Sequence, residues 1–182
     1  MKKESSAAYI ARLAITLLLI TAVVAAGLAC VNAVTAPEIE ALNAQKTQTA
    51  IEAVLPGGGE EIAFTDDSGI VSTIYKGQSG YAVEVTPAGF NGTVTMMVGV
   101  DNAGKVLGIS IVNHTETAGL GAEAASQGAA GTAFRGQFAG MSGSVSVSKD
   151  GGQVDALTGA TITSRAVCTG VNAALSAAAK LG

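Results

Sequence analysis

The longest hydrophobic pattern in the chain is an apolar run near its N-terminus. Residues 13–34 contain no charged side chain and include Leu17-Leu18-Leu19-Ile20. A helix of about 22 residues is about 33 Å long, which is enough to cross a hydrocarbon core of about 30 Å. The pattern therefore predicts one transmembrane helix over residues 13–34.

Basic residues flank this run on its N-terminal side. Lys2, Lys3 and Arg12 precede it, and the next basic residue is Lys46. Because Lys and Arg are enriched on the cytoplasmic side of membranes, residues 1–12 are expected in the cytoplasm. We therefore expect a single-pass protein of the cell membrane, with the C-terminal part of the chain extracytoplasmic.

Two other interpretations of the N-terminal run remain open. A cleaved signal peptide also combines a basic start with an apolar run, although its apolar core is normally about 7–15 residues long. A lipoprotein would be acylated at Cys30, but Gly27-Leu28-Ala29 is a poor recognition sequence for that modification. The length of the run favours the transmembrane helix.

After the run, the hydrophobic pattern becomes periodic. Thr35-Ala36-Pro37-Glu38 is typical of a helix start, and Ile39 and Leu42 begin a loosely helical spacing of apolar residues. Pro56-Gly57-Gly58-Gly59 ends this segment. Residues 35–59 are therefore predicted to form a membrane-proximal helix, or stalk.

Four short runs rich in β-branched residues follow, separated by Gly, Asn and Asp. They predict antiparallel strands over residues 70–75, 81–86, 93–101 and 105–113. Asp101-Asn102-Ala103-Gly104 is expected to join the last two as a hairpin, because these residues tolerate positive φ or cap their own backbone.

The C-terminal part of the chain returns to helical spacing. Residues 118–143 are glycine-rich with few large apolar residues, so they are expected to cover the sheet as a loop with a short helix. The last segment predicts a helix with Thr163 or Ser164 as its cap and mostly small residues on one face. Helix, strands and helix in this order predict an α+β fold, with an extracytoplasmic domain over residues 60–182.

Composition excludes several classes of site. The formal net charge of -4, with ten Lys and Arg, argues against a nucleic-acid partner. A single histidine and scattered acids predict no metal site. Cys30 lies in the apolar run and Cys168 near the C-terminus, so no disulfide framework is expected.

The most informative polar segment is Asp155-Ala156-Leu157-Thr158-Gly159-Ala160-Thr161. Its small residues predict a tight turn that presents the Thr161 hydroxyl at the N-terminus of the last helix. The free N–H groups and the dipole of a helix N-terminus favour an anion such as phosphate. An ordinary turn and helix cap is the alternative that these residues by themselves leave open.

This segment, continued by Ile162-Thr163-Ser164, resembles the flavinylation motif Asp-x-x-Ser/Thr-Gly-Ala-Thr of the FMN-binding domain family. The family is found in the G subunit of Rnf-type electron-transport complexes and in the C subunit of sodium-translocating NADH:quinone reductases. The resemblance implies that a separate flavin transferase uses FAD to attach FMN to Thr161 as a phosphoester. It also implies that the cofactor site includes Thr158, Gly159 and Ala160.

Two further segments resemble the same family. His114-Thr115-Glu116-Thr117-Ala118-Gly119-Leu120-Gly121 is similar to its Glu-Thr-Pro-Gly-Leu-Gly segment, with Ala118 in place of the usual proline. Gly89-Phe90-Asn91-Gly92 is similar to the aromatic and glycine residues that begin a central strand in that family. The first of these similarities implies that three side chains lie near the flavin: Glu116, Thr117 and Leu120.

Several other side chains near these segments have two interpretations each. His114 is a proton donor near the flavin or a solvated or hydrogen-bonded loop residue, and Glu116 contacts the cofactor or makes a local turn bond. Arg165 pairs with the phosphate or is solvated. Cys168 is expected to fill space in the core.

The resemblance implies an electron-relay subunit of a membrane-bound Rnf-type ferredoxin:NAD oxidoreductase complex, which couples electron transfer to Na⁺ or H⁺ translocation. Its partners would be the other membrane subunits and the flavin transferase. We expect no catalytic residue in the chain itself and little activity in isolation. Two alternatives remain open: a stand-alone extracytoplasmic flavoprotein reductase, and a flavin-free structural adaptor.

Overall fold

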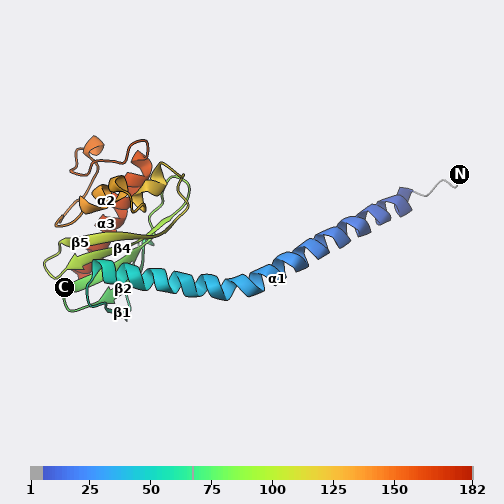
Figure 1. Cartoon of the computed structure of the whole chain (residues 1–182), viewed down its shortest axis with the longest axis horizontal. Helices are drawn as coiled ribbons and strands as arrows, with labels where there is room; N and C mark the ends of the chain where they lie inside the picture. Colours follow the sequence, from blue (N-terminus) through green and yellow to red (C-terminus); the bar gives the residue numbers. More distant parts are fainter. Residues whose placement is uncertain (1–5, 67, 182) are drawn as a thin grey trace. The chain divides into compact units, whose positions relative to one another are not determined.

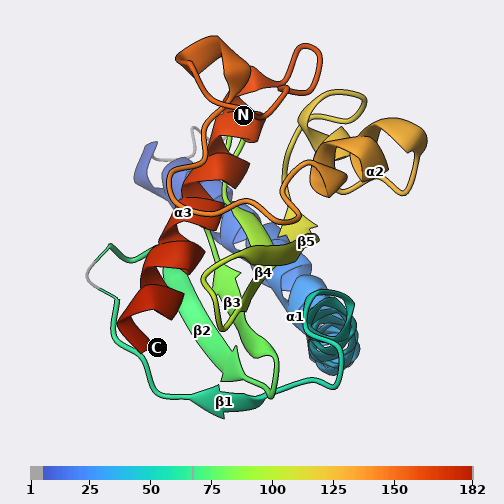
Figure 2. The ribbon, with the colours of Figure 1, turned by 90° about the vertical axis from the view of Figure 1, so that its left-hand side faces the viewer.

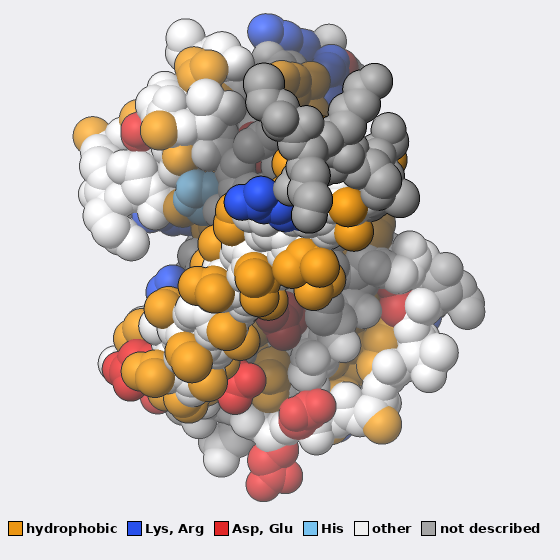
Figure 3. Space-filling view, turned by 90° about the vertical axis from the view of Figure 1, so that its right-hand side faces the viewer, with side chains coloured by type: hydrophobic (Ala, Val, Ile, Leu, Met, Phe, Trp, Pro, Cys, Tyr) orange, Lys and Arg blue, Asp and Glu red, His pale blue; other side chains and the backbone are white. Residues whose placement is uncertain are grey.

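The computed structural model describes residues 6–66 and 68–181 and begins with one long helix. Helix α1, Ser6–Val54, is continuous through Pro37 (Figure 1). Within the described residues it is the helix long and apolar enough to span a membrane. The large apolar side chains of its first part, from Tyr9 to Leu42, are exposed, as Figure 3 shows, and Val23 is 72% accessible. The expected span of residues 13–34 therefore lies inside this helix.

The separate stalk helix predicted for residues 35–59 is not a separate element. Proline removes one backbone N–H, but the remaining hydrogen bonds of a long helix hold it together on both sides. The last part of α1 belongs to the compact domain, which starts at Gln45. This start lies before residue 60, where the sequence predicted the extracytoplasmic domain to begin, because Ile51 and Val54 are buried against the sheet.

The domain contains one antiparallel sheet of five strands in sequence order (Figure 2). Four strands agree with the predicted ones to within one residue at every boundary. Strand β1 was not predicted, because its three residues show no apolar alternation. The strands are β1 (Glu60–Ile62), β2 (Val71–Lys76), β3 (Gly80–Val85), β4 (Val94–Asp101) and β5 (Val106–His114).

The hairpin between β4 and β5 confirms the predicted turn. The Asp101 carboxylate accepts hydrogen bonds from the N–H groups of Ala103 and Lys105, at 2.9 and 2.8 Å. Gly104 has a φ of +76°, which a residue without a Cβ adopts at little cost. The side chain of Asp101 and the freedom of Gly104 therefore define the connection.

The two faces of the sheet are covered by different helices. Because successive side chains of a strand point to opposite faces, Ala82 packs with the end of α1 while Val83 packs with the core under α3. Helix α3, Thr161–Leu181, crosses this second face (Figure 2). Gly170 lets it approach closely, since a Cβ there would lie 3.0 Å from Val85 Cγ2. The predicted α+β fold is confirmed.

The segment between the sheet and α3 is largely irregular, as the sequence predicted. It contains two short 3₁₀ helices, η1 (Gly121–Ala124) and η2 (Ser148–Asp150), and one α-helix, α2 (Ala129–Gly136). Phe134 and Phe138 anchor it with an edge-to-face contact of 5.4 Å between ring centroids. Both rings are buried, so the segment is fixed to the core and holds the loops around the start of α3.

Candidate functional site

A tight turn places Thr161 as the first residue of α3. Gly159 has a φ of +73°, the Ala160 N–H donates to Leu157 O at 3.0 Å, and the Ser164 N–H donates to Ala160 O at 3.0 Å. The helix therefore starts earlier than predicted, and Thr163 and Ser164 lie inside its first turn instead of capping it. The reason is the left-handed conformation of Gly159, which reverses the chain within this turn.

The Ser164 side chain stabilises the turn from inside. Its hydroxyl donates to Ala160 O at 3.0 Å and accepts from the Leu157 N–H at 3.0 Å, and it is fully buried. The first N–H groups of a helix have no partner within the helix. The Thr161 hydroxyl and these N–H groups are thus presented together at the start of α3.

Glu116 connects the three segments that resemble the FMN-binding family. Its Oε2 accepts a 2.6 Å hydrogen bond from the Thr163 hydroxyl, and its Oε1 accepts from the N–H groups of Phe90 at 2.8 Å and Asn91 at 3.2 Å. Only 8% of Glu116 is accessible. Its carboxylate therefore holds the loop after β3 and the start of α3 in one arrangement.

Two glycines make room for this carboxylate. A Cβ on Gly121 would lie 2.5 Å from both Glu116 Oε2 and Thr163 Oγ1, and a Cβ on Gly89 would meet Glu116 Oε1. Any larger residue at either position would displace the buried hydrogen bonds. Gly89 and Gly121 occur in the two family-like segments for a packing reason that the sequence did not show.

Lys149 is a site residue that sequence analysis missed. Its ammonium donates a hydrogen bond to the Thr161 hydroxyl, with 3.1 Å between Nζ and Oγ1. Lys149 lies in η2, twelve positions before Thr161 along the chain. The available signal was a basic residue followed by the turn-forming Asp150-Gly151-Gly152, which is common in surface loops and is not specific to a binding site.

Arg165 forms an ion pair with Asp150. Two hydrogen bonds of 2.7 Å join its Nε and its NH2 group to the two carboxylate oxygens. The hydrogen bond from Arg165 lowers the pKa of Asp150, and the same contact raises the pKa of Arg165. Arg165 was a candidate partner of the phosphate, but its guanidinium pairs with Asp150 instead. This ion pair connects η2 to α3.

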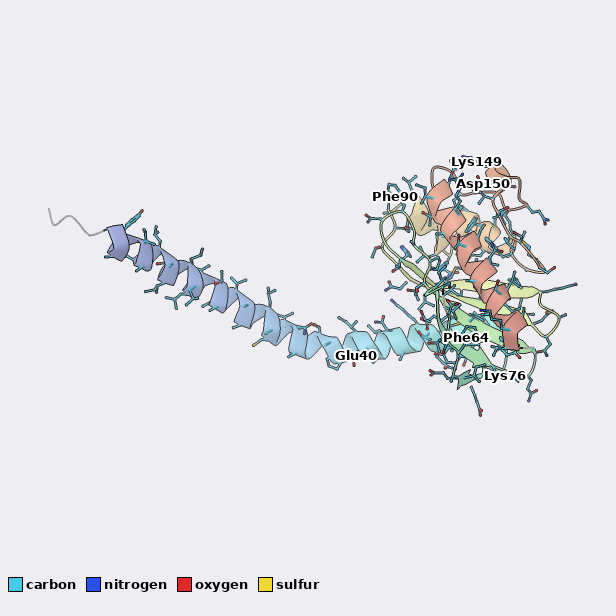
Figure 4. The ribbon with its side chains drawn as sticks, turned by 180° about the vertical axis from the view of Figure 1, so that it is seen from behind. Glu40, Phe64, Lys76, Phe90, Lys149 and Asp150 are labelled. Carbon is cyan, nitrogen blue, oxygen red and sulfur yellow. The ribbon has the colours of Figure 1, made fainter. Side chains whose placement is uncertain are left out.

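Thr161 opens onto a pocket of about 280 Å³ whose rim is apolar. Three rim residues are unusually exposed for their type: Phe90 at 64%, Ile162 at 48% and Leu120 at 43%. Phe90 and Lys149 lie at the same end of the domain in Figure 4. The pocket is lined by Phe90, Glu116, Thr117, Leu120, Gly121, Lys149, Gly159, Ala160, Thr161, Ile162 and Thr163.

The structure brings six of the seven predicted cofactor-site residues to this pocket: Glu116, Thr117, Leu120, Gly159, Ala160 and Thr161. Thr158 lines a neighbouring pocket of about 500 Å³, which also contains Leu120 and Asp155. The larger pocket does not include Thr161. The smaller one is therefore the candidate site, because it combines the hydroxyl, the cation and the apolar rim.

The remaining candidates have structural roles in this arrangement. His114 accepts a hydrogen bond from the Glu116 N–H at 3.3 Å through Nδ1, so it helps to order the loop. Cys168 is buried in the core as predicted, and burial raises the pKa of its thiol to about 11. Across residues 6–66 and 68–181, no group of His, Cys, Asp and Glu is arranged to hold a metal ion.

Comparisons with known proteins identify the family to which this domain belongs. The family profile described as "FMN-binding domain" matches residues 89–176, which include the whole candidate site. The G subunit of an ion-translocating oxidoreductase complex from Methanosarcina acetivorans is 32% identical, over 91% of this chain and 93% of its own length. The chain belongs to the family of Rnf complex G subunits.

Other relatives have names of the same kind. The G subunit of the Na⁺-translocating ferredoxin:NAD⁺ oxidoreductase complex of Acetobacterium woodii is 35% identical, over 88% of this chain and 87% of its own length. The proton-translocating counterpart from Clostridium ljungdahlii is 41% identical over about half of each chain. This Rnf G subunit is therefore an electron-transfer subunit with an FMN-binding domain, within a multi-subunit membrane oxidoreductase complex.

Proposed function

We propose that this Rnf G subunit relays electrons through an FMN whose phosphate is esterified to Thr161 on the extracytoplasmic side of the membrane. One observation carries the proposal: the Thr161 hydroxyl accepts a 3.1 Å hydrogen bond from the ammonium of Lys149, and both residues line a pocket with an apolar rim. FMN has a phosphate at one end and a flat ring system at the other. The two parts of the site correspond to these two ends.

The phosphate end of the site is formed by the start of α3. The dipole and the first N–H groups of this 21-residue helix favour a negative charge beside Thr161. Gly159 and Ala160 carry little or no side chain, so a phosphate reaches the backbone without obstruction. Thr158 is exposed in the same turn, and we propose its hydroxyl as a further polar contact.

The ring end of the site is formed by the apolar rim. Phe90, Leu120 and Ile162 expose large apolar surfaces to solvent, and covering them with a flat aromatic system removes that surface from water. We propose that Thr117 and Glu116 complete the wall, with Glu116 acting mainly through the loops that it connects. The chain thereby supplies the position and the surroundings of the ring.

Bound FMN supplies the redox chemistry, and the protein positions it relative to electron donors and acceptors in neighbouring subunits. A covalent phosphoester removes the dissociation equilibrium, which is an advantage for a carrier facing a large extracytoplasmic volume. Because the proposed role is to pass electrons between neighbouring subunits, we expect little activity from the isolated subunit. The ion moved by the complex is Na⁺ or H⁺.

Maturation would require a flavin transferase that uses FAD. The test is to express the full chain with and without such a transferase, and to measure the intact mass and the mass of the peptide containing Thr161. The expected result is a mass increase of one FMN less one water, on that peptide, in the presence of the transferase. An unmodified Thr161 peptide after co-expression would contradict the proposal.

Variants of the same turn make the test specific. Thr161→Val preserves the side-chain shape and removes the hydroxyl, so flavin fluorescence in a denaturing gel should be lost. Thr161→Ser keeps a hydroxyl and should retain at least part of the flavin fluorescence. Thr163→Ala is not a suitable control, because Thr163 is buried and hydrogen-bonded to Glu116.

A further inference from the structure

The contact between Lys149 and Thr161 concerns the oxygen atom that would be modified. Lys149 Nζ lies 3.1 Å from Thr161 Oγ1, and an ammonium group has donors only. The hydroxyl oxygen is therefore the acceptor. A positive charge is already in place at the atom on which negative charge would develop during esterification.

The backbone of Lys149 is held from both sides. Asp150 is bound by Arg165 of α3 through two hydrogen bonds of 2.7 Å. On the other side, the Ser148 N–H donates to Val154 O at 2.8 Å, and Val147 pairs with Val154. The short loop is thus closed on itself and attached to the helix that begins with Thr161, so Lys149 stays within reach of it.

Lys149 is the one basic side chain that lines the pocket in the described part of the chain. Arg165 is next to the motif, but its charge is shared with Asp150. Glu116, the acid of the pocket wall, is buried and accepts three hydrogen bonds from protein donors. Lys149 therefore supplies the positive charge nearest to Thr161.

We propose that Lys149 stabilises the negative charge at Thr161 while FMN is being attached, and that it then pairs with the resulting phosphodiester. This inference rests on the proposed function, since it concerns the same ester bond. In the attachment step, Thr161 Oγ1 forms a bond to the FMN phosphorus of FAD. The pyrophosphate P–O bond breaks, and AMP leaves with the electron pair of that bond.

The hydroxyl proton passes to a base of the transferase or to water. Lys149 keeps its protons and donates a hydrogen bond throughout. The product has two ester bonds and one negative charge on the phosphate, which one ammonium neutralises. Hydrogen bonds between charged partners are the strong ones, and their removal costs a factor of roughly 10 to 100 in an equilibrium or a rate.

The experiment measures the rate of attachment by intact mass, with purified full-length apoprotein, the transferase and FAD. Lys149→Ala and Lys149→Gln should lower kcat roughly 10- to 100-fold, with little change in the KM for the apoprotein. Lys149→Arg should recover most of the rate, because it restores a cation. Lys76→Ala is the matched control: it removes one exposed positive charge at the opposite end of the domain (Figure 4) and should react like the wild type.

Thermal unfolding of each apoprotein accompanies the kinetics. Lys149 is exposed, so its variants should unfold close to the wild-type temperature, and slow attachment would then report the reaction itself. Attachment to Lys149→Ala within twofold of the wild type would overturn the inference. A raised KM with unchanged kcat would also overturn it, because Lys149 would then only help the transferase to dock. Failure of wild-type protein to gain FMN would instead contradict the proposed function.

Discussion

The hydroxyl of Thr163 donates a 2.6 Å hydrogen bond to the Glu116 carboxylate across 47 positions of sequence. Both groups are buried, and the other oxygen of Glu116 receives the N–H groups of Phe90 and Asn91. The pocket beside Thr161 consequently depends on one acid that connects two loops to the first turn of α3. Its shape should be sensitive to the loss of any of these buried hydrogen bonds.

Breaking this hydrogen bond should destabilise the domain. Thr163→Val leaves a buried carboxylate oxygen without its donor, and Glu116→Ala leaves the N–H groups of Phe90 and Asn91 unpaired. We expect each to lower the free energy of unfolding by about 1–3 kcal/mol, as measured by chemical denaturation. The double variant should lose less than the sum of the two single losses.

Glu60→Gln is the control for this prediction, because Glu60 is an exposed acid of β1. It should change the free energy of unfolding by less than about 0.5 kcal/mol. Fully additive losses for Thr163→Val and Glu116→Ala would show that the contact between them carries no stabilisation.

Gly121→Ala tests how tightly the pocket wall is packed. The new methyl group would lie 2.5 Å from Glu116 Oε2 and from Thr163 Oγ1, so one of them must move. We expect a loss of about 1–3 kcal/mol in the free energy of unfolding. Gly136→Ala is the matched control, since a Cβ there meets nothing within 4 Å and α2 gains a better helix former. Equal stabilities of the two variants would contradict the packing described for Gly121.

Glu84 gives the domain a pH-dependent stability. It lies on β3, on the sheet face that packs against the end of α1, and burial followed by the charge of Glu61 raises its pKa. The folded state therefore holds the Glu84 proton more tightly than the unfolded state, so stability falls as the pH rises from 4.5 through the raised pKa. Glu84→Gln removes this charge and should stabilise the domain at pH 7.

The expected gain for Glu84→Gln is about 0.5–1 kcal/mol, because Glu84 remains partly solvated. The advantage of the variant should shrink as the pH is lowered toward 4 and the wild-type carboxyl becomes protonated. Thermal unfolding of the wild type and the variant at a series of pH values measures this stability difference. A gain that is the same at every pH would show that packing, and not charge, is responsible.

Membrane orientation is open to a labelling test at Ala103. This residue is exposed in the turn between β4 and β5, and Ala103→Cys should react with a membrane-impermeant thiol reagent in intact cells. The native background should be low, because Cys168 is buried with its pKa raised to about 11 and Cys30 lies within the apolar part of α1. Labelling that requires permeabilised cells would place the domain on the cytoplasmic side.

Much of this protein follows from local sequence patterns. The apolar run inside α1, the four main strands, the turn at Asp101 to Gly104 and the small-residue face of α3 depend on periodicity and turn chemistry within a few residues. The segments around Thr161 and Leu120 were identified by their resemblance to the FMN-binding domain family, and they converge on one pocket. Local physics decided the helices, strands and hairpin turn, so a single sequence was sufficient to predict them.

Tertiary structure decided the rest, because it depends on which distant residues meet. The position of Lys149 beside Thr161 follows from a loop that is closed by Val154 and held by Arg165, and no local pattern marks it. The burial of the end of α1 could not be predicted, because it depends on packing against the sheet face opposite α3. The start of α3 at Thr161 depends on the backbone conformation of Gly159, since a glycine can adopt either sign of φ and the sequence does not select one.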